Sequence, residues 1–404
     1  MSRMVVESFS IPSRIVNLRA EAAFTVLEKA KLAERKGIDV VHLEIGEPDF
    51  DTPRHIKEAA IEALRRNETH YTPTPGMPEL REAVAEYLRE VYGVDFDWKD
   101  NIAITVGAKQ AVFAVMLSIL EEGDEVIYPE PGYPAYSSAA AYAGARTIPY
   151  RLTIDNGFSM KAEKLSEMIT PKTKIIVLNS PNNPCGSVMP SQDVKEIVEL
   201  AEDHKLYILS DEIYRPIIFD DLQHYSPLNY ASHTDRVILV DGFSKRYAMT
   251  GWRLGYVAIS KEIYPYLVKV LNIMTSCPVS FAQRAAVAAL RGPQEPVYDM
   301  VREYEKRRDV VVEELSKIQG LRFIKPTGAF YAFVDVSHIL GKIGKNSEEF
   351  VLDLIENYGV AFLHGTAMGD YGEGYIRISF ANSVDNIRRG IRRLKQAVEE
   401  IMGE

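Results

Sequence analysis

Short runs of valine, isoleucine and leucine alternate with segments of helix length through the middle of this sequence. Strands are predicted at residues 102–106, 125–128, 174–178, 206–210 and 236–240, and helices at 109–120 and 191–205. Continuous apolar strands separated by helices are typical of a mainly parallel sheet that is buried on both faces. The sequence therefore predicts an α/β protein with a mainly parallel central sheet in a large domain.

The two ends of the chain show a different pattern. The C-terminal part predicts a long charged helix at 295–318, strands at 329–334 and 375–380, and helices at 347–358 and 383–402. The first 50 residues predict only one helix and one strand, too little for a core of their own, so we expect them to pack on the C-terminal part. We predict three regions: an N-terminal arm with part of a small α+β domain (1–54), the large domain (55–290), and an interdomain helix with the C-terminal small domain (291–404).

Charge and composition narrow the classes of function. The net charge is −10 and no basic block occurs, so we expect no nucleic-acid partner. The longest apolar run, at 111–120, is too short to span a bilayer, and the N-terminus lacks the apolar region of a signal peptide. Only two cysteines occur, which favours a reducing compartment. We expect a cytoplasmic protein with no membrane partner, and no metal ligands are predicted.

Polar residues follow four of the predicted strands. In open parallel sheets, ligands bind beyond the carboxyl ends of the strands, so these residues are candidates for one site. Each also has a simpler explanation: Asp211 as a helix cap, Asn183 as part of a turn, or Lys245 as a solvated loop residue. The four strand ends supply Gly107-Ala108-Lys109, then Asn183, then Asp211 with Tyr214, and finally Ser244 with Lys245.

Taken together, these residues describe one kind of pocket. The turn at Gly107 can bind a phosphate through free backbone amides, although a tight turn explains its glycine equally well. Tyr133 offers a flat platform or a core aromatic, Asp211 a buried acid, and Lys245 an amine. This combination is what a protein needs to hold pyridoxal phosphate, with the acid at the pyridinium nitrogen and the lysine as a Schiff base.

Five motifs occur in an order that resembles one family. They are LEIGEPDF (43–50), SPNNP (180–184), DEIY (211–214), GFSK with MTGWRLGY (242–256) and YIRISF (375–380). Together they resemble the class I/II aminotransferases, pyridoxal-phosphate enzymes of fold-type I, along nearly the whole chain. The resemblance implies that residues 55–290 form the cofactor-binding domain and that the protein is a homodimer with shared active sites.

The resemblance also implies roles for the residues around the cofactor ring. Lys245 is similar to the lysine that forms the Schiff base. Asp211 matches the acid that keeps the pyridine nitrogen protonated. Tyr214 and Asn183 match the pair that hydrogen-bonds the phenolic oxygen, and Tyr133 stands where the family has an aromatic stacked on the ring.

A second set of residues resembles the family's phosphate ligands. These are the amides of Ala108 and Lys109, together with Ser244 and Arg253. A planar guanidinium suits a phosphate better than an ammonium does, which favours this role for Arg253. Tyr71 is similar to a tyrosine that reaches the phosphate from the other subunit.

The expected substrate contacts come from Arg377, Asn183 and Gly46. Arg377 resembles the arginine that binds the substrate α-carboxylate, with help from Asn183 and the Gly46 backbone. The family usually has threonine where this chain has Cys185, and we expect a local packing change from this difference; a redox-sensitive thiol is the alternative. No residue here decides between aspartate, alanine and aromatic donors.

Three functions are consistent with these motifs. The resemblance favours an aminotransferase that moves the amino group of an L-amino acid to a 2-oxo acid such as 2-oxoglutarate. A pyridoxal-phosphate lyase of the same fold, such as a C–S β-lyase or an aminocyclopropane-carboxylate synthase, shares most of the motifs. A ligand-sensing regulator would need a DNA-binding module, and the residues before Leu43 are too few for one.

Overall fold

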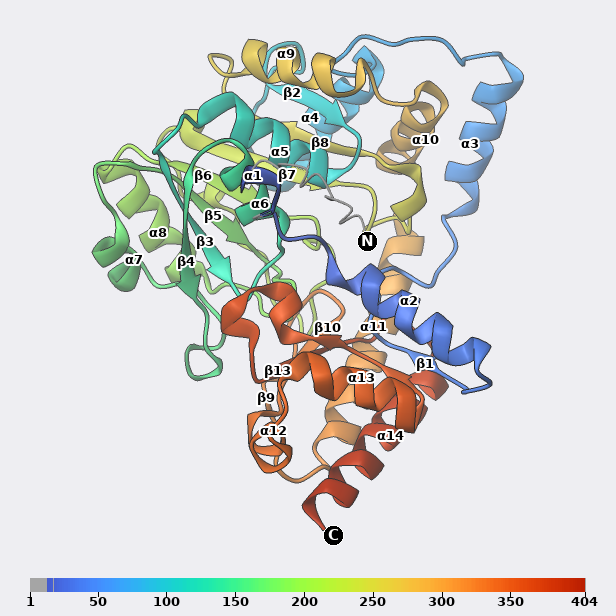
Figure 1. Ribbon diagram of the computed structural model, residues 1–404. Helices are drawn as coiled ribbons and strands as arrows, with labels where there is room; N and C mark the ends of the chain where they lie inside the picture. Colours follow the sequence, from blue (N-terminus) through green and yellow to red (C-terminus); the bar gives the residue numbers. More distant parts are fainter. Residues whose placement is uncertain (1–12, 17, 404) are drawn as a thin grey trace, which may run out of the picture.

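A computed structural model describes residues 13–16 and 18–403, and its largest feature is a seven-stranded sheet (Figure 1). Its order is β2-β8-β7-β6-β5-β3-β4, and all neighbours are parallel except β8, which is antiparallel to β7 and β2. The predicted α/β fold with a mainly parallel sheet is confirmed. The strands are β2 (Ile102–Thr105), β3 (Glu125–Glu130), β4 (Arg146–Arg151), β5 (Thr173–Asn179), β6 (Tyr207–Asp211), β7 (Val237–Gly242) and β8 (Gly255–Ala258).

Both faces of this sheet are buried. Val126 and Ile175 belong to the core under helices α5, α6 and α9, whereas the adjacent residues Ile127 and Ile176 belong to a core that includes α8. The double burial explains why the sequence shows continuous apolar runs instead of alternation. The helices of this part are α3 (Arg54–Arg65), α4 (Pro78–Tyr92), α5 (Ala108–Ile119), α6 (Ala135–Tyr142), α7 (Ala162–Met168), α8 (Ser191–Asp203), α9 (Tyr264–Thr275) and α10 (Ser280–Arg291).

Two strands of the sheet were not predicted. β4 lies at the edge of the sheet and is largely half-buried or exposed, so it lacks the apolar run of the central strands. β8 has only four residues and begins at a glycine inside the MTGWRLGY motif. β4 lacks the apolar run on which the other predictions depended, and β8 lacks a helical segment that separates it from β7.

The C-terminal part contains a four-stranded antiparallel sheet in the order β12-β13-β10-β9. From the N-terminal segment, β1 (Val41–His42) pairs with β11 (Val360–Ala361), which confirms that this segment packs on the C-terminal part. The remaining elements are α1 (Ser13–Val16), α2 (Ala22–Arg35), β9 (Arg322–Phe323), β10 (Tyr331–Asp335), α12 (Ser337–Ile343), α13 (Ser347–Tyr358), β12 (Leu363–His364), β13 (Tyr375–Ser379) and α14 (Val384–Met402).

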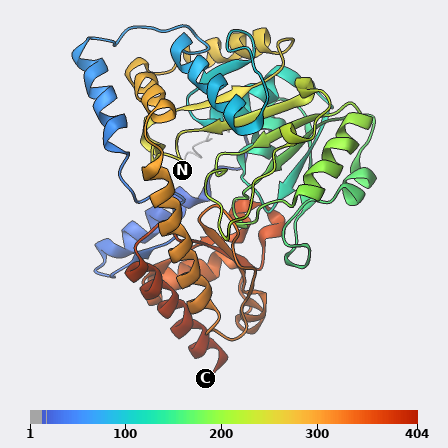
Figure 2. The ribbon, with the colours of Figure 1, turned by 180° about the vertical axis from the view of Figure 1, so that it is seen from behind.

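Helix α11 (Glu295–Leu315) connects the two parts, as the view from behind shows (Figure 2). Its first turns contribute Val297 to the core with α4 and α10, and its later turns contribute Val311 and Leu315 to the C-terminal core. The three domain boundaries stay predictions, and residues 1–12 and 17 of the N-terminal arm lie outside the described residues. Across the described ranges, every helix is too short or too polar to cross a membrane.

Candidate active site

The strands expected to carry the site end at the same edge of the sheet. Asn179, the last residue of β5, lies opposite Asp211, the last residue of β6. Gly242 at the end of β7 and Thr105 at the end of β2 both pair with Gly255 of β8. A cavity of about 500 Å³ opens at this edge, between the large sheet and the C-terminal part.

Every predicted site residue except Tyr71 lines this cavity. Tyr71 is 91% exposed and lies elsewhere; its predicted site belongs to a partner subunit, so its role stays a prediction. The residues brought together are Gly46, Ala108, Lys109, Tyr133, Asn183, Asp211, Tyr214, Ser244, Lys245, Arg253 and Arg377.

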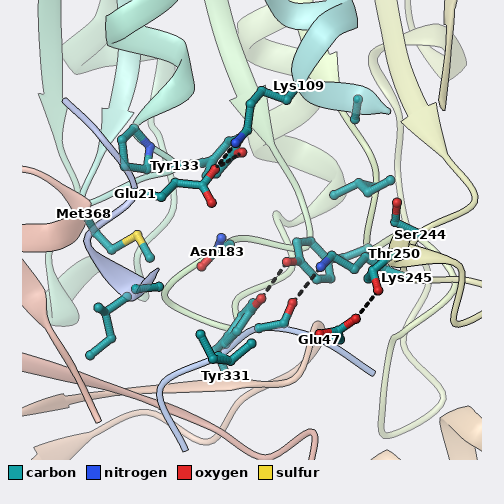
Figure 3. A pocket seen from close by; sticks show the side chains of 18 of the residues that line it. Glu21, Glu47, Lys109, Tyr133, Asn183, Ser244, Lys245, Thr250, Tyr331 and Met368 are labelled. Carbon is teal, nitrogen blue, oxygen red and sulfur yellow. Dashed lines mark hydrogen bonds and ion pairs between the residues drawn. The ribbon is translucent and has the colours of Figure 1, made fainter. Parts of the chain in front are cut away.

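Lys245 follows β7 and points into the cavity (Figure 3). Its Nζ donates a hydrogen bond to the Gly46 carbonyl at 2.6 Å and lies 5.9 Å from the Tyr214 ring centroid. Withdrawal from water lowers the pKa of Lys245 to about 8. At pH 7, roughly one protein molecule in ten therefore carries Lys245 as a neutral, nucleophilic amine. A Cβ at Gly46 would lie 2.0 Å from the Tyr331 hydroxyl, so only glycine fits there.

Asp211 is a buried carboxylate whose partners are neutral. Its Oδ2 accepts a hydrogen bond from the Tyr136 hydroxyl at 2.7 Å, and its Oδ1 accepts one from the Ile213 amide at 3.2 Å. Burial raises the pKa of Asp211 to about 6, partly offset by these hydrogen bonds. At pH 7 the group is therefore mostly ionised and can pair with a cationic ring nitrogen.

The amino terminus of α5 forms an anion cradle with Arg253. Gly107 precedes the helix with a φ of 80°, and a Cβ there would lie 2.6 Å from the Arg253 guanidinium. A Cβ at Gly255 would lie 2.6 Å from the Ala108 amide nitrogen. The two glycines therefore leave open space beside the first amides of α5 and the Arg253 guanidinium. Free amides at a helix start and a guanidinium both favour a bound phosphate.

Arg377 is oriented by two hydrogen bonds. It lies on β13 and is 3% exposed. Its Nη1 donates to the Asn183 side-chain oxygen at 3.0 Å, and its Nη2 donates to the Glu44 carbonyl at 2.6 Å. Its Nε, although buried, has no hydrogen-bond partner within the described chain. Because buried donors are rarely left unpaired, this guanidinium is suited to an incoming carboxylate.

Two pairs of aromatic side chains form the walls. The rings of Tyr133 and Tyr136 meet edge to face, with their centroids 5.7 Å apart. The hydroxyls of Tyr214 and Tyr331 are hydrogen-bonded to each other at 2.6 Å (Figure 3). Flat side chains with polar tips can hold an aromatic ring and also hydrogen-bond its substituents.

Several lining residues were not assigned from the sequence. Tyr136 lies in the first turn of α6, three residues after Tyr133, which precedes the helix. Glu47 and Thr250 lie within the quoted motifs LEIGEPDF and MTGWRLGY, and membership of these motifs could have indicated them. Nothing local in the sequence indicates three others, which come from segments outside the motifs: Glu21, Phe24 and Met368.

Cys185 does not provide a reactive thiol. It is 1% exposed and belongs to the core that contains Ile176 and α8. Burial raises the pKa of the Cys185 thiol well above its ordinary value, so it remains protonated. This supports a packing role for the residue, and Cys277 is likewise a free cysteine.

These features fit pyridoxal phosphate. The buried carboxylate of Asp211, the low-pKa amine of Lys245 and the cradle at Gly107 each match one part of that molecule. Within residues 13–16 and 18–403, no group of three or more His, Cys, Asp or Glu side chains is placed to hold a metal ion.

Comparisons with known proteins identify the family. Residues 38–394 match the family described as "Aminotransferase class I and II". A "Probable aspartate aminotransferase" of Methanocaldococcus jannaschii is 42% identical over 395 residues, covering 96% of this chain and all of that protein. An "Aromatic-amino-acid aminotransferase 2" of Thermococcus litoralis is 39% identical and covers 90% of this chain and 93% of its own. A solved aspartate aminotransferase structure from Rhizobium meliloti superposes with a TM-score of 0.92 at 35% identity, over 97% of this chain and 99% of that one.

The chain therefore belongs to the class I and II aminotransferases, a family of pyridoxal-phosphate enzymes. It is an aminotransferase, as the motifs had indicated.

Proposed function

We propose that this protein moves the amino group of an L-amino acid to 2-oxoglutarate, using pyridoxal phosphate bound as a Schiff base to Lys245. The observation that carries the proposal is the shared cavity of Lys245, Asp211 and Arg377. Lys245 after β7, Asp211 on β6 and Arg377 on β13 would supply the amine, the ring-nitrogen partner and the α-carboxylate ligand.

The cofactor would be held by residues from all sides of the cavity. When bound, pyridoxal phosphate supplies an electron sink for charge that develops at the substrate Cα. The α5 amides, Ser244 and Arg253 would bind its phosphate, and Asp211 would hold a proton on the ring nitrogen. Tyr133 would pack on the ring face.

Side chains of this protein would orient the substrate and transfer the proton. Arg377 and Asn183 would orient the substrate α-carboxylate, which places the Cα hydrogen toward Lys245. The Lys245 amine would then take the proton from the substrate Cα and hold it for the next transfer. A lysine with a pKa near 8 is a base of suitable strength for this transfer at neutral pH.

A donor panel tests this function directly. Purified enzyme with pyridoxal phosphate and 2-oxoglutarate should form glutamate from at least one L-amino acid, with the matching 2-oxo acid in equal amount. A lyase would instead release ammonia and pyruvate from cysteine-type donors without needing 2-oxoglutarate. Product formation that is independent of 2-oxoglutarate would contradict the proposal.

Replacing Arg377 with lysine should weaken binding of every amino donor. Lysine keeps the charge but loses the fork that meets a carboxylate with two hydrogen bonds. A charged hydrogen bond contributes about 1.5–3 kcal/mol, so KM should rise about tenfold to a hundredfold for all donors. Arg392→Lys, at an exposed position of α14, is the matched control. An effect confined to dicarboxylic donors would show that Arg377 binds the side chain instead.

We also propose a homodimer in which Tyr71 completes the partner's phosphate site. Tyr71 precedes Thr72, whose hydroxyl accepts a hydrogen bond from Gln283 of α10, and its own ring is almost fully exposed. An aromatic ring held on an ordered loop in full contact with water suits an interface. Because both cysteines are free thiols, a reducing cytoplasm is the compartment we propose.

Tyr71→Phe should weaken cofactor affinity by about one to two decades, because a hydrogen bond to a charged phosphate contributes about 1.5–3 kcal/mol. Tyr298→Phe, an exposed tyrosine of α11, should have no such effect. Mixed dimers of Tyr71→Phe and Lys245→Ala subunits should contain one native site, since both defects then fall in the other site. A mixed population with no site of native affinity would contradict the shared-site dimer.

A further inference from the structure

The cavity contains a tight group of polar side chains around Glu21 (Figure 3). The Glu21 carboxylate lies 2.6 Å from the Lys109 ammonium and accepts a hydrogen bond from the Tyr133 hydroxyl at 2.5 Å. Two residues earlier, the Arg19 backbone exchanges hydrogen bonds with the Ser138 hydroxyl of α6. The segment that carries Glu21 is therefore attached to the wall of the cavity.

The other cationic side chains of the cavity indicate the role of the Glu21–Lys109 ion pair. If the proposed function holds, Lys245 bonds to the cofactor, Arg253 meets the phosphate and Arg377 meets the α-carboxylate. Among the described residues that line the cavity, Lys109 is then the one cationic side chain left for a second substrate carboxylate. The Lys109 ammonium already forms an ion pair with Glu21.

The Glu21–Lys109 pair is ionised and partly exposed to water. Burial alone would raise the pKa of Glu21, but hydrogen bonds from Lys109 and Tyr133 lower it, so the carboxyl is ionised at neutral pH. The side chains of Glu21 and Lys109 are 27% and 47% exposed, so the pair is weak enough to be displaced. The lining of the same cavity also includes apolar side chains, which can accept an uncharged substrate side chain: Ala22, Ala23, Phe24, Leu363 and Met368.

We propose that Glu21 sets the side-chain specificity of this enzyme by competing with a substrate's second carboxylate for Lys109. Amino acids with uncharged, apolar side chains bind with the Glu21–Lys109 pair intact. Dicarboxylic substrates, including a dicarboxylic amino acceptor, must displace Glu21 first and bind more weakly for that reason. This inference rests on the proposed function and adds the substrate class to it.

The test compares two non-reacting acids on the holoenzyme. Succinate has a second carboxylate, whereas 3-phenylpropionate has an apolar ring at that end. In Glu21→Gln, calorimetry should show succinate binding about threefold to tenfold more tightly, because Lys109 is released from a competing charge. Binding of 3-phenylpropionate should change by less than about twofold. The ratio of kcat/KM for aspartate over phenylalanine should rise in the same variant.

Two controls separate this effect from a change in structure or overall charge. Glu28→Gln removes the same charge from an exposed position of α2 and should leave both affinities unchanged. Glu21→Gln combined with Lys109→Gln should lose the gain for succinate, since the released cation is gone. Should Glu21→Gln fail to fold, Glu21→Ala removes the same carboxylate and carries the same expectation.

The inference fails if an active Glu21 variant binds succinate no better than the wild type, or if both acids gain equally. That outcome leaves the proposed function standing. If neither the wild type nor the variants transfer an amino group from any donor, the proposed function itself fails. The two failures are therefore distinguishable within one set of experiments.

Discussion

Lys245→Ala is expected to abolish nearly all amino transfer while leaving the protein folded. The side chain lies in the cavity and, among residues 13–16 and 18–403, bonds only the Gly46 carbonyl, so its removal breaks no ion pair within these residues. A positioned acid–base group contributes about 10²–10⁴-fold to rate, and this lysine would also bond the cofactor, so kcat should fall by at least about 10³-fold. The measurement is single-turnover formation of 2-oxo acid from the best donor of the panel.

Its control is Lys269→Ala, which removes an exposed lysine of α9 and should keep full activity. Lys245→Ala should still bind pyridoxal phosphate, because the ring and phosphate contacts remain. A variant that keeps more than about a tenth of the wild-type kcat would show that another group moves the proton.

Asp211→Asn is expected to lower kcat by about 10²–10³-fold with little change in KM. The amide keeps the shape of the carboxylate but cannot stabilise a protonated ring nitrogen. Loss of one preorganised electrostatic partner in a buried site has an effect of about this size. Because the interaction matters most where charge develops, the effect should appear in kcat.

Glu212, the residue after Asp211, provides the control for this substitution. Glu212 is also a buried carboxylate, but it accepts hydrogen bonds from Tyr92, Ser210 and Ser226 outside the cavity. Glu212→Gln should therefore lower the melting temperature and leave kcat near the wild-type value. If Asp211→Asn raises only KM, the assignment of Asp211 to the ring nitrogen is wrong.

Much of the fold could be predicted because the central strands are buried on both faces. That burial leaves continuous apolar runs, and the residue after each run falls at the same edge of the sheet. This rule places Asp211, and the segment that leads from β7 to Lys245, at the edge of the sheet where the cavity lies. Their family roles came from the motifs.

The other contacts of the site could not be predicted because they join segments that are distant in the sequence. Glu21 lies 88 positions before Lys109, and only the closed tertiary structure brings their charges within 2.6 Å. The same holds for Tyr331 and Tyr214, whose hydroxyls meet across the two parts of the chain. β8 was missed for a local reason, since it begins at Gly255 inside the MTGWRLGY motif and no segment of helix length separates it from β7.

The central claim is that Lys245 bonds covalently to pyridoxal phosphate. Purified enzyme should be yellow, and reduction with borohydride followed by peptide mass spectrometry should find the cofactor mass on Lys245 and on no other lysine. The same treatment of Lys245→Ala should leave every peptide unlabelled. A cofactor adduct on a different lysine, or none on a yellow wild-type enzyme, would contradict this account.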